Sequence, residues 1–163
     1  ALSQAAVRGS ELFFSARLGC GGCHSGVHLT VASRSANAGS GSAAPFHNIG
    51  LYDLDGQGAY PEAAPGLIAD SGIGRDMGRF RVPSLRNVAV TAPYMHDGSV
   101  ATLEEVVAIY EDGGRGPGAG SPLRSELLAD FELDERERAD LVTFLESLTD
   151  QLVLSDPGLA NPW

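Results

Sequence analysis

The chain has 163 residues, of which 43% are hydrophobic, and this is enough for the core of one domain. Its formal net charge of -10 argues against a nucleic-acid partner, because the phosphate backbone repels a negative protein. The same charge suits a basic protein partner, since complementary charge speeds encounter between redox proteins. No apolar run is long enough to span a membrane, and 21 glycines predict many turns and long loops.

The N-terminal part begins with one predicted helix and then loses its regular pattern. Apolar residues recur at helical spacing over residues 4–17, which predicts an amphipathic helix that ends at Gly19. Residues 25–79 are rich in Gly, Ala, Ser and Pro and show no sustained period. We expect loops and short turns throughout this stretch.

Two further helices carry clear start signals. Thr102 and Glu105 have the spacing of a capping box, and Gly113 ends the helix that follows. Asp134 and Glu137 repeat the same spacing ahead of a second apolar stripe. The chain is therefore expected to be mainly α-helical.

The sequence contains no internal repeat, so nothing indicates a duplicated domain. We expect one domain over residues 1–150 and an extended C-terminal arm over residues 151–163. Trp163, the single tryptophan, ends this arm, and docking or disorder is a better expectation for it than a redox role.

The run CGGCH contains both cysteines of the chain, Cys20 and Cys23, followed directly by His24. In this pattern the two thiols add to the vinyl groups of a haem, and the adjacent imidazole becomes the proximal ligand of the iron. A zinc site would need further Cys or His at regular spacing, and a thioredoxin-like pair would need a βαβ context. The sequence therefore predicts one covalent haem c in a class I cytochrome c-like domain with long irregular loops. The haem in turn predicts a periplasmic or otherwise exported protein.

The residues alone do not identify the sixth ligand of the iron. The identity of this ligand decides whether the domain only transfers electrons or also performs chemistry at the iron. His28 follows His24 by four residues, which is too close in the chain for it to reach the opposite haem face. Met77 and His47 fall in expected loops, where pocket-lining or exposed positions are more common. The candidates are Met77, Met95, Tyr110 and three histidines.

A resemblance to a known family is carried by residues 80–107, with the sequence FRVPSLRNVAVTAPYMHDGSVATLEEVV. This run resembles the signature of the C-terminal haem domain in the bacterial di-haem cytochrome c peroxidase and MauG family. Support comes from RGSELFFSARLGCGGCHSG, FHNIGL and LDERERADLVTFLESL, so the resemblance covers most of the chain. It implies two c-haems in two similar domains, one that activates hydrogen peroxide and one that exchanges or stores electrons. This chain resembles the second.

The resemblance favours Tyr110 as the sixth iron ligand. In the peroxidases that ligand is a Met fourteen residues after the His of the HDG motif, and the same count from His96 gives Tyr110. MauG-like members, by resemblance, have a tyrosine at this place. Relative to Met, an oxygen ligand stabilises the ferric and higher oxidation states, which favours storage of oxidising equivalents. The alternative is an ordinary core tyrosine on the helix stripe.

The family also implies a calcium site near the boundary between the two haem domains. Its expected ligands in this chain are the backbone carbonyls of Thr91 and Pro93, and a further ligand comes from the other haem domain. Residues 53–58, with the sequence DLDGQG, do not suffice for a calcium loop, because Ala64 stands where an acidic twelfth residue is required. We expect an exposed turn there.

Three residues in the family-like stretch have an expected supporting role in the haem pocket, Arg81, Arg86 and His96. Donors and cations near the haem propionates would offset buried negative charge. Each of the three could equally face solvent or bond a loop carbonyl.

Two functions of different classes remain open from the sequence. The first is a domain or subunit of a MauG-like peroxidase, an oxidoreductase that takes oxidising equivalents from hydrogen peroxide with a second haem domain or haem subunit. Its further partner would be a redox protein donor or a protein substrate, and the sequence identifies no catalytic residue. The alternative is a simple mono-haem electron-transfer cytochrome c with Met77 or Met95 on the iron.

Overall fold

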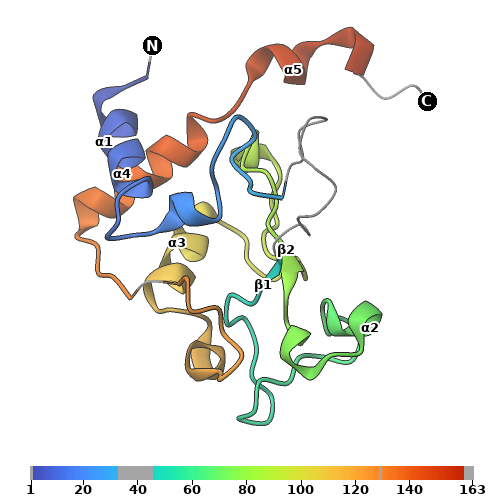
Figure 1. Ribbon diagram of the computed structural model, residues 1–163. Coiled ribbons are helices and arrows are strands. Elements are labelled where there is room, and N and C mark those ends of the chain that lie inside the picture. Colours follow the sequence, from blue (N-terminus) through green and yellow to red (C-terminus); the bar gives the residue numbers. More distant parts are fainter. Residues whose placement is uncertain (1, 33–45, 129, 160–163) are drawn as a thin grey trace.

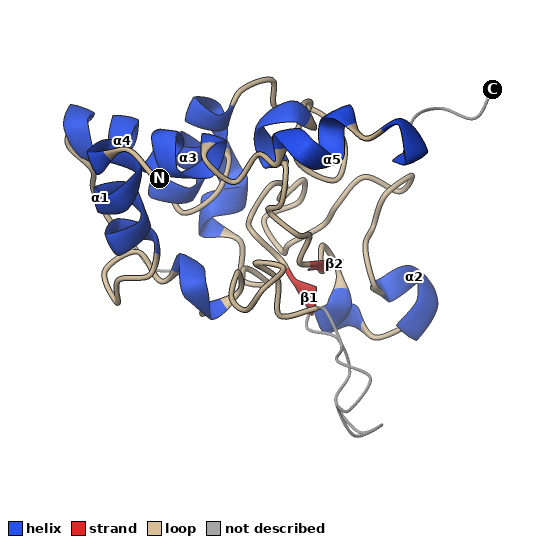
Figure 2. Ribbon diagram, turned by 90° about the horizontal axis from the view of Figure 1, so that it is seen from above, coloured by secondary structure: helices blue, strands red, loops and turns tan. Residues whose placement is uncertain are grey.

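The computed structural model describes residues 2–32, 46–128 and 130–159. The mainly α-helical class is confirmed, and long irregular loops connect short elements (Figures 1 and 2). The α-helices of the described ranges are α1 (Gln4–Phe13), α2 (Ile68–Ser71), α3 (Leu103–Glu111), α4 (Glu135–Glu146) and α5 (Gln151–Ser155). Short 3-10 turns cover Cys20–Gly22, Gly74–Asp76, Val88–Val90, Gly116–Gly120 and Pro157–Leu159, and the strands are β1 (Phe46–His47) and β2 (Phe80–Arg81).

Helices α1 and α4 cross in direct contact, which brings the two ends of the domain together (Figure 1). The approach is close because position 9 is glycine: a Cβ there would overlap the Asp140 carbonyl oxygen and lie 2.8 Å from the Cβ of Phe144. The Arg8 guanidinium spans the crossing and donates to both carboxylate oxygens of Asp140, at 2.6 and 2.7 Å. The N-terminal helix is shorter than predicted and ends at Phe13.

Both predicted capping boxes are present, at the N-termini of α3 and α4. The two helices are joined by Glu111 in α3, whose carboxylate accepts from the Arg138 guanidinium at 2.7 Å and from the Leu133 backbone N–H at 2.8 Å. Glu111 thereby fixes the loop before α4 as well as α4 itself.

The main core forms where α1, α3 and α4 meet. It draws on residues close to both ends of the domain, so the segment that carries the two cysteines packs against the helices through Cys20. Its buried members are Phe13, Leu18, Leu103, Val107, Leu133, Leu141, Val142, Phe144 and Leu145, and Cys20 packs against them.

Strands β1 and β2 pair antiparallel, with Phe46 opposite Arg81 and His47 opposite Phe80. A hydrogen bond from the Thr30 hydroxyl to the Val82 carbonyl, 2.8 Å long, ties the cysteine-bearing segment to the end of β2. The loop-rich region is therefore anchored beside the segment that follows the CGGCH motif.

Residues 151–155, expected in an extended arm, are helical in α5. The Asp150 carboxylate accepts from the backbone N–H groups of Leu152 and Val153, which supplies the helix with an N-cap. Every residue of α5 is exposed, and the segment projects from the body of the protein (Figure 1). Trp163 lies outside the described residues. Within the described ranges, no helix is long and apolar enough to cross a membrane.

Candidate haem centre

The CGGCH motif lies in a tight turn directly after α1. Gly19 has a φ of 69°, a left-handed conformation that glycine adopts without steric cost, and it turns the chain into the 3-10 turn at Cys20–Gly22. The backbone N–H of His24 then bonds the Cys20 carbonyl at 2.9 Å. The turn therefore fixes the two thiols and the imidazole in one short, rigid segment.

The two cysteines are half-buried free thiols. Burial raises the pKa of Cys20 to about 11, and burial also raises the pKa of Cys23. Both sulfurs are therefore protonated at neutral pH, the state in which a thiol adds across a vinyl group to form a thioether.

The His24 imidazole is oriented by the backbone. Its Nδ1 lies 3.1 Å from the Leu29 carbonyl oxygen, and because a carbonyl can only accept, Nδ1 carries the proton and Nε2 keeps its lone pair. Burial lowers the pKa of His24, against the opposing effect of hydrogen bonds to the carbonyls of Leu29 and Pro83. A neutral ring with a free Nε2 is the form that ligates iron.

Tyr110 lies near the C-terminal end of α3 and faces the same region. Burial raises its pKa above the ordinary value for tyrosine, and the nearby thiols of Cys20 and Cys23 raise it further, so the phenol and the cysteine pair are close. None of the described residues hydrogen-bonds to its hydroxyl, and the side chain is partly buried. An oxygen left without a protein partner beside the cysteines is available to a cofactor.

These residues fit a c-type haem. Two neutral thiols, one imidazole with a free Nε2 and one unpartnered phenol oxygen converge on one region, and they are the groups that attach the haem and can ligate its iron on both faces. Met77 and Met95 have different surroundings: the Met77 carbonyl accepts from the Asn48 amide, and Met95 lies in a turn with a φ of 69°.

Two of the three residues expected to support the haem pocket, Arg81 and Arg86, bond backbone carbonyls. Arg81 donates to the Ala32 carbonyl at 2.7 Å, and Arg86 donates twice to the Val27 carbonyl, at 2.7 and 2.9 Å. These bonds hold the segment after His24 against the chain that leaves β2. Arg81 retains further N–H groups for a carboxylate.

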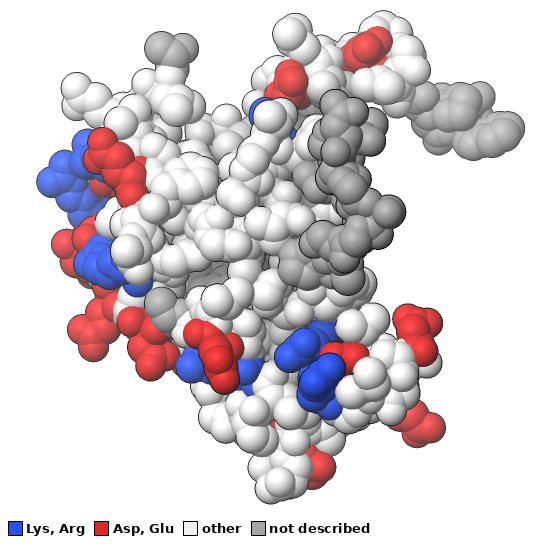
Figure 3. All heavy atoms as spheres, in the orientation of Figure 1, with Lys and Arg blue, Asp and Glu red and all other residues white. Residues whose placement is uncertain are grey.

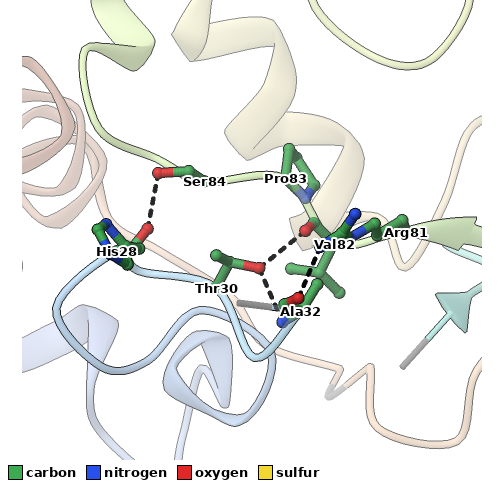
Figure 4. Close-up of a pocket in the computed structure, with 7 residues that line it drawn as sticks. All are labelled: His28, Thr30, Ala32, Arg81, Val82, Pro83 and Ser84. Atoms are coloured by element: carbon green, nitrogen blue, oxygen red, sulfur yellow. Dashed lines mark hydrogen bonds between the residues drawn. The ribbon is translucent and has the colours of Figure 1, made fainter. Parts of the chain in front are cut away.

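A pocket of about 450 Å³ lies along this seam (Figure 4). Figure 4 shows the Ser84 hydroxyl bonded to the His28 carbonyl and Thr30 bonded to Val82. Neither cysteine lines the pocket, and Tyr110 does not line it either. The pocket is therefore separate from the proposed haem ligands. It is lined by His28, Thr30, Ala32, Arg81, Val82, Pro83 and Ser84.

Two remaining predicted residues, Thr91 and Pro93, lie in an exposed turn after the 3-10 turn Val88–Val90. The Thr91 hydroxyl donates to the Val88 carbonyl at 3.0 Å. In the described part of the chain, no three His, Cys, Asp or Glu side chains gather as a metal site.

One polar cluster was not expected from the sequence. It surrounds Asp97, whose carboxylate accepts from the Tyr52 hydroxyl at 2.5 Å and from the Ser99 backbone N–H at 3.0 Å. The Arg115 guanidinium lies 3.8 Å from the same carboxylate and 4.6 Å from the centre of the Tyr52 ring. Residues 45 positions apart meet here, and no sequence period signals such a contact. Beside it, the His96 imidazole stacks on Phe80 at 3.7 Å between ring centres.

The charge distribution is uneven. Figure 3 shows a face whose centre carries few charged side chains, with acidic and basic groups together along its edges. Such a face suits a partner with an apolar contact surface.

Comparison with known proteins agrees with the haem centre. No family model matches the chain. The cytochrome c peroxidase IdrP1 of Denitromonas iodatirespirans is 36% identical over 178 aligned positions, which cover 100% of this chain and 46% of the relative. The methylamine utilization protein MauG of Methylorubrum extorquens is 36% identical over 148 positions, which cover 91% of this chain and 35% of the relative.

Solved structures show the same relationship. The crystal structure of a MauG-like protein associated with microbial copper homeostasis superposes with a TM-score of 0.93 at 47% identity, over 100% of this chain and 52% of that chain. The di-haem peroxidase BthA of Burkholderia thailandensis, at 22% identity and a TM-score of 0.63, shares the fold.

The chain spans about a third to a half of the length of the curated relatives it matches. These relatives are named cytochrome c peroxidases or MauG, so their shared cofactor is haem c. On its sequence and its fold, the chain is homologous over its whole length to a part of the MauG-like proteins and cytochrome c peroxidases.

Proposed function

We propose that this chain is a c-type haem redox domain of a MauG-like peroxidase, which handles oxidising equivalents from hydrogen peroxide together with a second haem domain or haem subunit. The proposal rests on one observation: the unpartnered Tyr110 hydroxyl faces the cysteine pair, while His24 is held with Nε2 free. An oxygen donor opposite an imidazole favours high oxidation states of iron over reduction.

Each residue of the centre has a distinct task in this proposal. Cys20 and Cys23 would attach one haem covalently, and the Leu29 carbonyl keeps the His24 proton on Nδ1, so that the lone pair of Nε2 is free to bind iron. Tyr110 would supply the sixth ligand as phenol or phenolate oxygen. The bound haem would supply one-electron redox chemistry.

The lengths of the relatives support the proposed partners. The relatives are about twice as long as this chain, which leaves room for a second haem domain in the same polypeptide or in another subunit. A protein substrate or redox donor would meet the face that carries few charged side chains. A calcium ion at the carbonyls of Thr91 and Pro93, and a periplasmic or otherwise exported location, belong to the same proposal.

The test compares the haem-loaded protein with Tyr110→Met, which installs the ligand of an electron carrier. We expect the wild type to have the lower midpoint potential and to change its visible spectrum rapidly with stoichiometric peroxide, whereas Tyr110→Met responds slowly. Tyr94→Phe is the matched control, because the Tyr94 hydroxyl bonds the Val88 carbonyl. A wild-type spectrum typical of His/Met ligation and indifferent to peroxide would establish the alternative, a mono-haem electron-transfer cytochrome.

A further inference from the structure

Tyr52 differs from the other tyrosines in its hydrogen-bond acceptor. Its hydroxyl donates to a carboxylate, Asp97, at 2.5 Å. Tyr60 donates to the Asn48 amide oxygen, Tyr94 donates to a backbone carbonyl, and no described residue bonds the Tyr110 hydroxyl. Since amide and carbonyl oxygens are far weaker bases than a carboxylate, only Tyr52 among the four tyrosines is paired with a base that is ionised at neutral pH.

We propose that Tyr52 and Asp97 form a proton-coupled redox site, through which the domain passes an oxidising equivalent from its buried centre to the protein surface. The oxidant is the peroxide-derived equivalent of the proposed function, on which this role rests. One electron leaves the Tyr52 phenol for that oxidant, the O–H bond breaks, and the proton moves to Oδ2 of Asp97. A neutral tyrosyl radical and a neutral carboxylic acid remain. An electron from a protein substrate or redox donor, with return of the proton, restores the phenol.

The surroundings of Tyr52 favour this coupled route. The Arg115 guanidinium, 4.6 Å from the ring centre, opposes any positive charge on the ring, so the electron leaves readily only when the proton leaves with it. Arg115 is held in place by a 2.6 Å bond to the Ser99 hydroxyl. The Ser99 backbone N–H holds the other carboxylate oxygen, which leaves Oδ2 directed at the phenol.

A run of aromatic rings connects this site to the haem side of the domain. The Tyr52 ring lies 5.5 Å from Tyr60 and 6.3 Å from His96, and His96 stacks on Phe80 at 3.7 Å. Phe80 lies in β2, and the hydrogen bond from the Thr30 hydroxyl to the Val82 carbonyl ties the end of this strand to the cysteine-bearing segment. Closely spaced rings provide short steps for electron transfer from Tyr52 to Phe80, on the side of the domain that carries this segment.

The groups around Asp97 keep its carboxylate ionised, which is the form that accepts the proton. Burial, which would raise its pKa, is outweighed by hydrogen bonds from Tyr52 and Ser99 and by the charge of His96, which together lower the pKa to about 2. The groups that face it are Tyr52, His96, Ser99 and Arg115. Asp97 is therefore ionised at every pH above about 4, and the loss of an electron makes the phenol acidic enough to protonate it.

The first arm of the test needs no peroxide. A photogenerated ruthenium tris-bipyridine oxidant removes one electron from the haem-loaded protein, and freeze-quench EPR with ring-deuterated tyrosine identifies the radical. We expect a tyrosyl radical in the wild type and in Tyr94→Phe, and its loss in Tyr52→Phe. Asp97→Asn should lower the yield about tenfold or more, because the base is gone. The wild-type yield should stay level between about pH 7 and pH 8, where Asp97 is ionised and His96, whose pKa is lowered by burial, is neutral.

The outcomes separate this role from the proposed function. A radical that survives Tyr52→Phe, or a yield unchanged in Asp97→Asn that keeps its wild-type circular dichroism, would overturn the site. A second arm replaces the ruthenium oxidant with stoichiometric peroxide, and the same radical is expected. If photo-oxidation gives the Tyr52 radical and peroxide gives no oxidised species at all, the failure lies with the proposed function. If peroxide oxidises the haem without the Tyr52 radical, the relay role is wrong.

Discussion

The crossing of α1 and α4 predicts a large effect from the smallest substitution, Gly9→Ala. A Cβ at position 9 would overlap the Asp140 carbonyl oxygen and lie 2.6 Å from the Asp140 carbonyl carbon and 2.8 Å from the Phe144 Cβ. Backbone cannot rotate away as the end of a side chain can. The helices must therefore separate by about 1.5 Å to bring these contacts to ordinary van der Waals distance.

The expected loss in the free energy of unfolding follows from two opposing contributions. Alanine stabilises a helix by about 1 kcal/mol relative to glycine. Overpacking of a tight contact costs about 1–3 kcal/mol, with backbone contacts at the upper end, and separation of the helices also weakens the bidentate bond from Arg8 to Asp140. We expect a net decrease of about 2 kcal/mol in the free energy of unfolding, or about 4–8 °C in Tm for a chain of this size.

Thermal and chemical denaturation of Gly9→Ala beside Gly74→Ala would measure this effect. Gly74 is the matched control, because a Cβ there meets no atom within 4 Å and its φ is not positive. We expect Gly74→Ala to stay within about 0.5 kcal/mol of the wild type. If Gly9→Ala is equally stable, the close crossing of α1 and α4 does not exist in solution.

Three further predictions concern single interactions. Glu111→Gln should lower the free energy of unfolding by about 1–2 kcal/mol, because the charged bond to Arg138 is lost, and urea titration that shows no change would contradict the contact. Thr102→Ala should cost about 1 kcal/mol through loss of the α3 N-cap, measured the same way; an unchanged midpoint would mean that the capping box contributes nothing. The free energy of unfolding should also fall as the pH drops from about 4 toward 2. In the folded state the pKa of Asp97 is lowered to about 2 and the pKa of Glu111 is lowered too. The ionised carboxylates therefore stabilise the folded state, and this stabilisation is lost as they gain protons. A thermal midpoint that is constant across this window would refute that assignment.

The parts of the fold that could be predicted from sequence are those set by local rules. The capping boxes at Thr102 and Asp134 act within one helical turn, and the structure has both. The CGGCH motif is equally local, because two thiols and an imidazole within five residues leave few other uses.

The parts that could not be predicted depend on contacts between distant residues. Nothing in the spacing of Tyr52 and Asp97 indicates that their side chains meet, and the pairing of β1 with β2 involves only two residues in each strand. The helical start of the C-terminal segment depends on the side chain of Asp150, a single-residue cap with no second signal beside it in the sequence.

The central claim is that Cys20, Cys23 and His24 hold a haem whose sixth ligand is Tyr110. The most direct measurement is the electronic and EPR spectrum of the ferric protein, wild type beside Tyr110→Phe, before and after stoichiometric peroxide. We expect Tyr110→Phe to change the ligand field of the ferric haem, and we expect peroxide to produce a high-valent species in the wild type. A His/Met spectrum that survives both the substitution and peroxide would contradict the central claim.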